Sequence, residues 1–169
     1  RSSAASDVYK RQEYKNGDWV KLDSTTVAGG TFTFTGRQDT ATNCFIIYAK
    51  DGKRNRADFF LENGNITVAL GEENKIGGTA NNDTYQQFKD NFIAMSKEMN
   101  DMYRSAMSDS TLTDEQRENV MKEIEKKDSI AMDMVFNTIE ANITNAVGIQ
   151  LLPSYAAAFE SVSYTHLTL

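Results

Sequence analysis

Cys44 is the only side chain in this sequence with intrinsic nucleophilic reactivity. A thiol becomes a catalyst or a redox centre when a neighbouring base lowers its pKa, or when a second cysteine completes a dithiol. The chain has no second cysteine, and its single histidine, His166, lies near the C-terminus. Cys44 falls within an apolar run, which favours a thiol packed in the core.

Two short stretches have the composition of anion-binding sites. The first is K-R-N-R at residues 53–56, the one local cluster of basic residues, and a solvated hairpin tip explains it equally well. The second is G-G-T at residues 77–79, ahead of an expected helix. It lacks the lysine and the spacing of a phosphate-binding P-loop, so a turn accounts for it.

The remaining polar patterns are also non-specific. Glu72 and Glu73 are neighbouring acids in an expected loop, and paired loop acids are usually solvated. Asn-x-Thr triplets begin at Asn65, Asn82 and Asn142, and they match the glycosylation pattern at a frequency that chance explains in an Asn- and Thr-rich chain. The sequence therefore predicts no catalytic residue, no cofactor-binding residue and no metal ligand, and it predicts no enzymatic activity for this chain.

Composition narrows the class of protein further. The chain has 169 residues and a formal net charge of -6, and no basic stripe that would neutralise nucleic-acid phosphates. No run approaches the roughly 20 apolar residues that span a bilayer. One cysteine excludes an internal disulfide. We expect neither a nucleic-acid partner nor a transmembrane segment.

The first half of the chain has the pattern of β-structure. Residues 22–36 predict a hairpin: Val20 and Leu22 alternate on one arm, Phe32 and Phe34 alternate with threonines on the other, and Gly29-Gly30 forms the turn. Before it, N-G-D at residues 16–18 indicates a turn that closes an earlier strand.

Three further β-segments follow. Residues 43–50 predict a strand buried on both faces, ended by a turn at residues 51–53. Residues 56–62 and 65–70 flank Asn63-Gly64, the typical dipeptide of a two-residue turn, and predict a second hairpin. Residues 76–79 predict a last short strand.

After residue 80 the apolar period becomes helical. Asn81, Asn82 and Asp83 are residues that cap helices, and an apolar stripe spaced three and four apart then runs to about Met107. This stripe includes Met95, Met99 and Met102; we favour core packing against a second helix over a peptide-binding groove.

Two more helices are expected beyond this stripe. Thr113 and Gln116 form a capping-box signature that opens a second long helix, antiparallel to the first. Residues 146–152 predict a third, shorter helix that ends near Pro153. The expected fold class is α+β: an antiparallel β-sandwich-like module of about six strands, followed by a helical hairpin and a short third helix.

Both ends of the chain resemble translated sequencing adapter. Residues 2–12 (S-S-A-A-S-D-V-Y-K-R-Q) back-translate to a transposase-type adapter, and residues 162–169 (V-S-Y-T-H-L-T-L) back-translate to the reverse complement of part of the same DNA. We therefore expect residues 1–12 and 161–169 to be non-native. Residues 13–80 form a β-sandwich-like domain that is truncated at its N-terminus, and residues 81–160 form a helical hairpin and linker that leads to a missing C-terminal domain.

Three stretches together resemble a known family. Trp19 to Gly36, Ala57 to Val68 and Ile76 to Asp83 are similar to a domain of unknown function that precedes the thioredoxin-like domain in bacterial envelope thiol-disulfide oxidoreductases of the TlpA and peroxiredoxin-like type. The helical hairpin and N-A-V-G-I-Q-L-L at residues 145–152 resemble the linker that follows. The redox centre of such proteins is a W-C-x-x-C motif in the downstream domain, and no Cys-x-x-Cys occurs here.

The resemblance implies a role and a location. The chain would be a non-catalytic accessory module of an exported, often lipid-anchored oxidoreductase of the cell envelope or periplasm. Its partners would be the missing thioredoxin-like domain in cis and protein clients. The alternative is a free-standing envelope or surface module that binds carbohydrate or peptide.

Overall fold

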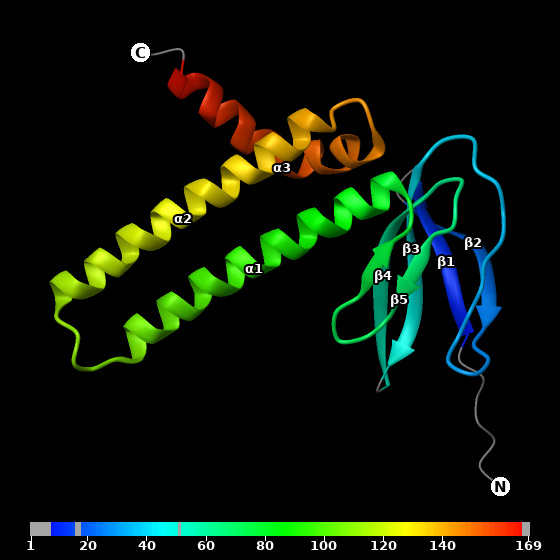
Figure 1. Ribbon diagram of the computed structural model, residues 1–169, viewed down its shortest axis with the longest axis horizontal. Helices are drawn as coiled ribbons and strands as arrows, with labels where there is room; N and C mark the ends of the chain where they lie inside the picture. Colours follow the sequence, from blue (N-terminus) through cyan, green and yellow to red (C-terminus); the bar gives the residue numbers. More distant parts are fainter. Residues whose placement is uncertain (1–7, 16–17, 51, 167–169) are drawn as a thin grey trace, which may run out of the picture. The chain divides into compact units, whose positions relative to one another are not determined.

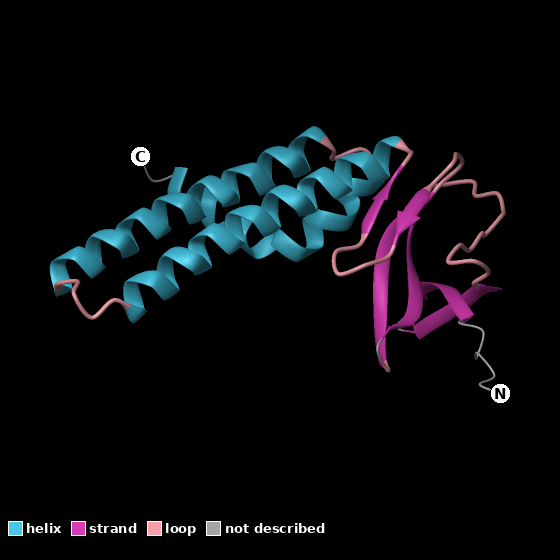
Figure 2. Ribbon diagram, turned by 60° about the horizontal axis from the view of Figure 1, so that its bottom comes forward, coloured by secondary structure: helices cyan, strands magenta, loops and turns pink. Residues whose placement is uncertain are grey.

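The computed structural model describes residues 8–15, 18–50 and 52–166, and the chain divides into two compact units, Arg1–Asp83 and Thr84–Leu169. The order of elements is six strands followed by three helices (Figure 1), which confirms the α+β class. Strands and their loops make up the first unit, and helices make up the second (Figure 2).

The first unit contains two antiparallel sheets. The larger sheet has the strand order β2-β1-β3-β4, and the smaller one pairs β5 with β6. The strands are β1 (Val8–Lys15), β2 (Asp18–Thr26), β3 (Thr42–Lys50), β4 (Lys53–Leu61), β5 (Thr67–Ala69) and β6 (Lys75–Gly77). The earlier strand expected before residue 16 is therefore present as β1, and its turn at residues 16–17 lies outside the described residues.

The predicted hairpin over residues 22–36 is wrong in its pairing. Its turn forms, with φ of 59° at Gly29 and 78° at Gly30, and Ala28 and Thr31 exchange backbone hydrogen bonds of 2.9 and 3.1 Å. Pairing stops there, because β2 forms its ladder with β1 instead. Phe32 and Phe34 pack against the core from a loop. The turn signal determined the conformation of four residues only, whereas the pairing of the strands depends on the rest of the sheet.

The second predicted hairpin is wrong for the same reason. β4 pairs with β3 across the turn at residues 51–52, as expected for that turn, and Asp51 lies outside the described residues. The flanks of Asn63-Gly64 do not pair with each other. Residues 67–69 pair instead with residues 75–77, in the short strand predicted at 76–79.

The core of the first unit lies on one face of the larger sheet. Cys44, Ile46 and Tyr48 of β3 face the same way as Ala57 and Phe59 of β4, because directly paired residues share a face, and all five are at most 6% exposed. Side chains from the 32–34 loop and from the β5–β6 sheet cover them.

The opposite face of β3 is less buried than the sequence predicted. Phe45 and Ile47 are half-buried, and the guanidinium of Arg56 lies 5.4 Å from the centre of the Phe45 ring. The prediction of a strand buried on both faces is therefore correct for one face only.

Asparagine side chains cover the free edge of β4. The hairpin register turns the backbone groups of Phe60 and Arg56 away from β3. Asn82 accepts a hydrogen bond from the Phe60 amide and donates one to the Phe60 carbonyl, both at 2.8 Å. Asn74 donates to the Arg56 carbonyl at 3.2 Å. These amides occupy positions that a neighbouring strand would otherwise take.

The helices are α1 (Ala80–Ser108), α2 (Asp114–Ala141) and α3 (Ala146–His166). α1 begins one residue before Asn81, so residues 81–83, expected as caps, lie inside its first turn. The capping box at Thr113 and Gln116 is confirmed, with both reciprocal hydrogen bonds present.

α3 does not stop at Pro153, which lies inside it, so the predicted end is wrong. A proline inside a helix removes one backbone donor, and the other residues of α3 keep the helix continuous across this position. The N-terminus of α3 is capped by Asn145, whose side-chain oxygen accepts from the amides of Val147 and Gly148.

The core of the second unit lies between α2 and α3. Val135 and Ile139 of α2 and Val147 and Leu151 of α3 are at most 5% exposed. A Cβ on Gly148 would collide with the Asn142 carbonyl, so a glycine is needed where α3 passes the end of α2.

We predict that Asn82→Ala destabilises the protein by about 2 to 4 kcal/mol, because it removes two buried hydrogen bonds from a side chain that is 1% exposed. Urea denaturation measures the change. Asn63→Ala is the matched control: Asn63 makes the same pair of bonds, with the amide and carbonyl of Gln38, but at an exposed position, so its loss should cost less than about 1 kcal/mol. Equal costs for the two variants would contradict the edge-covering role.

Candidate functional site

The structure places Cys44 at the centre of the β-unit core, with 0% of its surface exposed. It belongs to the cluster formed by the inward face of β3 and β4. The interpretation of Cys44 as a packed core thiol therefore agrees with its position.

The basic stretch 53–56 forms the first half of β4 and is largely exposed. Arg54 donates to the Gln12 side chain at 3.5 Å, at the limit of a hydrogen bond, and Arg56 lies over Phe45. The guanidinium groups therefore lie along a strand and do not converge on one point.

The glycine turn ahead of α1 is occupied by the protein itself. The amide of Gly78 donates to the carboxylate of Asp83 at 2.8 Å, and that same carboxylate leaves no room for a Cβ on Gly77. Gly78 has φ of 95°. An anion at this turn would face Asp83, so the geometry fits the turn interpretation.

The structure also shows where the other polar patterns of the sequence lie. Glu72 and Glu73 are exposed in a loop, and Glu73 pairs with Lys75 at 3.4 Å. Asn82 is buried with its amide engaged, which leaves no access for glycosylation in the folded protein. Among the described residues, no group of three or more His, Cys, Asp or Glu side chains is placed to hold a metal ion.

A cavity of about 240 Å³ lies in the β-unit, between the loop at residues 32–36 and the sheet. Its wall combines apolar side chains, such as Phe34 and Phe59, with the polar side chains of Arg11 and Glu62. One carboxylate oxygen of Glu62 is buried and without a partner, while the other accepts from Asn81 at 2.6 Å. The cation of this cavity, Arg11, lies 5.2 Å from the Phe34 ring and belongs to the adapter-like stretch. Outside that stretch, Glu62 is the charged side chain among the lining residues.

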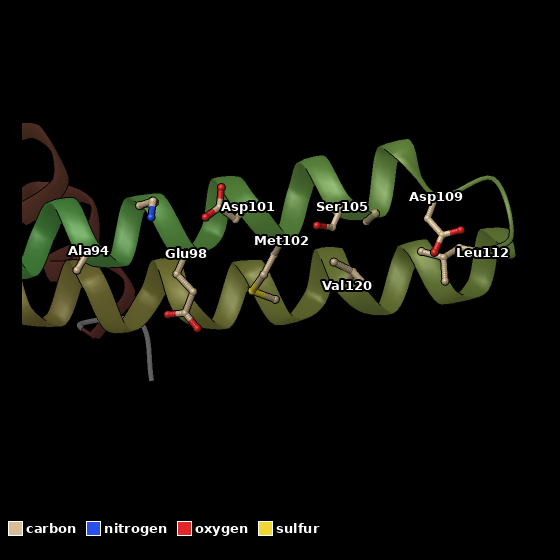
Figure 3. A pocket seen from close by; sticks show the side chains of 10 residues that line it. Ala94, Glu98, Asp101, Met102, Ser105, Asp109, Leu112 and Val120 are labelled. Carbon is tan, nitrogen blue, oxygen red and sulfur yellow. The ribbon is translucent and has the colours of Figure 1, made fainter.

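The helical unit has an open groove of about 770 Å³ between α1 and α2, near their connecting loop. Met102 reaches from α1 toward α2, and Val120 lies on the facing side of α2 (Figure 3). The lining residues, mostly from one stripe of α1, are Ala94, Lys97, Glu98, Asp101, Met102, Ser105, Ala106, Asp109, Leu112 and Val120.

The methionine stripe is only partly packed. Met95, Met99 and Met102 are half-buried, and of them Met102 lines the groove. The sequence prediction of core packing against the second helix therefore describes these side chains in part, because α1 and α2 leave space between them at this end.

Polar contacts join the two helices around the groove. Lys127 of α2 donates to Glu98 of α1 at 2.8 Å. Arg117 of α2 donates to the backbone carbonyls of Ala106, Asp109 and Leu112, and so satisfies acceptors at the C-terminal end of α1 and in the loop. One side chain therefore holds the closed end of the hairpin.

Asp109 orders the same loop from the other side. Its carboxylate accepts from the hydroxyl of Thr111 at 2.6 Å and from the amide of Thr111 at 2.8 Å. These hydrogen bonds, with a smaller effect of the Arg117 charge, hold the pKa of Asp109 below its usual value.

The net charge of the chain resides in the helical unit. Residues 84–169 contain 13 of the 24 acidic residues and 7 of the 18 basic ones, while residues 1–83 contain 11 of each. The whole formal charge of -6 therefore belongs to the unit that carries the groove.

Sequence reasoning missed three residues that organise these sites. Asn82 was expected as a helix cap, Arg117 follows a capping box and was not singled out, and Glu62 lay in a predicted hairpin arm. Only Glu62 had a local signal, as a carboxylate at the end of an apolar strand. The partners of Asn82 and Arg117 lie 22 and up to 11 residues away in sequence.

No helix in the described part of the chain has the length and apolar content needed to cross a bilayer.

Residues 2–85 match the model of a family described as a domain of unknown function (DUF4369). The match spans all six strands and the first turn of α1. No curated protein and no solved structure shows significant similarity to this chain.

We predict that Arg117→Lys lowers the free energy of unfolding by about 1 to 2 kcal/mol, because an ammonium group cannot reach all three carbonyls that the guanidinium contacts. Urea denaturation followed by helical circular dichroism measures the change. Arg104→Lys, on the exposed surface of α1, is the matched control and should change stability by less than about 0.5 kcal/mol. Indistinguishable stabilities would argue against the proposed role of Arg117.

We predict that Asp109 contributes to stability above its ordinary pKa, and that this contribution is lost as the pH falls from about 3.8 through its lower folded-state pKa. The sign follows because the folded state binds the proton more weakly than the unfolded state does. Comparing Asp109→Ala with the unaltered protein from pH 6 to pH 2 measures it: the difference in stability should shrink at low pH. A constant difference across this range would exclude the linkage.

Proposed function

We propose that this chain is the non-catalytic N-terminal accessory module of an exported bacterial thiol-disulfide oxidoreductase whose redox domain follows residue 160. Residues 2–85 match a domain of unknown function, which is compatible with the family resemblance of residues 19–36, 57–68 and 76–83. The thioredoxin-like parent is inferred from that resemblance alone. In this proposal the β-unit and the helices position the redox domain or present it to protein clients in the cell envelope.

The observation that carries the proposal is the environment of Cys44. Thiol-disulfide exchange needs an accessible thiolate and, in a dithiol enzyme, a second cysteine. Cys44 is fully buried among apolar side chains, and the sequence has no other cysteine. Redox chemistry of the parent protein would therefore come from another domain.

We also propose that residues 1–12 and 161–169 derive from adapter DNA. Residues 8–12 nevertheless form part of β1, in contact with β2 and β3. Strand pairing uses backbone groups that every residue except proline supplies, so a foreign segment with suitable side chains can occupy the place of a native strand.

The alternative function is a free-standing envelope module that binds carbohydrate or peptide. The feature that favours it is the open groove of the helical unit, which has apolar walls and a charged rim.

Recovering the gene on both sides of residues 13–160 from the source DNA tests the main proposal. We expect the reading frame to continue past residue 160 into a domain with a Cys-x-x-Cys motif, and the sequence before Glu13 to differ from residues 1–12. A frame that stops within a few residues of Glu160, with no such domain, would overturn the parent assignment and leave the binding module.

We further predict that Cys44 does not react with Ellman's reagent in the folded protein and reacts at the rate of a free thiol in denaturant, because burial excludes the reagent. The unfolding midpoint followed by thiol reactivity should coincide with the midpoint followed by circular dichroism. Rapid labelling of the native protein would contradict the assignment of Cys44 to the core and reopen a thiol-based activity.

A further inference from the structure

The groove between α1 and α2 is an apolar surface that the helical unit does not fill with its own side chains. Met102, Leu112 and Val120 face it and are only half-buried, although the two helices run side by side. Ala106 is the one α1 residue in the lining that is fully buried. A partner that covers this surface would remove further apolar area from water.

The length and lining of the groove fit an α-helix. Its residues on α1 run from Ala94 to Ala106, about 18 Å along the helix axis, which is the length of about three helical turns. Small side chains at Ala94 and Ser105 let a backbone approach closely. Met102 is flexible and polarizable, a property of surfaces that accept helices of varied sequence.

Charge indicates which kind of helix fits. Three carboxylates, Glu98, Asp101 and Asp109, line the groove together with Lys97. Lys127 pairs with Glu98 and the Arg117 guanidinium lies beside Asp109, so the charge that selects a partner is that of the helical unit around the groove. The unit as a whole carries the entire net charge of -6. An acidic helix would be repelled, and a second copy of this chain would bring the same charge.

We propose that the α1–α2 groove is a docking site for a basic amphipathic helix of a partner protein. The apolar face of that helix packs on Met102, Leu112 and Val120, and its lysines or arginines are attracted by the net negative charge of the helical unit. This inference is independent of the thioredoxin-like parent, since it rests on the helical unit alone.

The probe is an 18-residue peptide of leucine and lysine, with leucines at helical spacing and one tryptophan on the leucine face. We expect it to bind the full chain saturably, with a blue shift of the peptide tryptophan, and to bind more weakly as salt increases. A peptide with glutamate in place of lysine, and a scrambled Leu/Lys peptide without an apolar face, should not bind. No binding of the Leu/Lys peptide, or equal binding of either control peptide, would overturn the proposal.

Two serine variants test the location. Ser105→Arg places a bulky cation in the groove, and Ser129→Arg makes the same change at an exposed position of α2 outside it. We expect Ser105→Arg to weaken binding at least about tenfold and Ser129→Arg less than about threefold, since only the first blocks the contact while both change the net charge equally. If both variants weakened peptide binding equally, the effect would come from the overall charge, and the assignment of the groove as the binding site would be wrong. Dimers that form without peptide and that Ser105→Arg dissociates would assign the groove to a second copy instead.

Discussion

The arrangement of the β-unit depends most on how the free edge of β4 is covered. An edge strand exposes a row of backbone donors and acceptors, which must be paired, covered or left to water. Here Asn82, from the first turn of α1, provides one acceptor and one donor to Phe60, and Asn74, from the loop before β6, provides a donor to Arg56. A side-chain amide has the same donor and acceptor as a peptide group, so these residues act as short pieces of a fifth strand. On the opposite edge, β2, the amide of Ser24 donates to the carboxylate of its neighbour Asp23 at 2.6 Å.

The same asparagines organise what surrounds them. Asn74 also accepts from the hydroxyl of Tyr48 at 2.9 Å and from the amide of Gly71 at 3.3 Å, so the loop before β6 is joined to the buried face of β3. Asn82 in turn donates to Thr79, which orders the start of α1. Cys44 lies in the core behind this edge. Its burial is the observation from which we propose a non-catalytic role for the β-unit.

Local signals in the sequence predicted the elements better than their partners. The Gly29-Gly30 turn, the short strand near Ile76 and the Thr113 capping box all formed, because each depends on a few neighbouring residues. Which strands pair depends on the whole sheet, so both hairpin pairings were wrong. The prediction that the third helix ends near Pro153 was also wrong, because α3 continues past this residue. Capping rules could not predict the role of Asn82. Its partner is the backbone of Phe60, which faces the outer edge of the sheet only because of the register between β3 and β4.

Hydrogen exchange at two backbone amides tests the account of the sheet edges most directly. The amides of Phe60 in β4 and Lys21 in β2 both point away from their neighbouring strand by register, but only Phe60 has an asparagine acceptor. We predict that the Phe60 amide exchanges orders of magnitude more slowly than the Lys21 amide, which should exchange near the rate of an unstructured peptide. Equal and rapid exchange at both positions would contradict the claim that Asn82 closes the edge of the sheet.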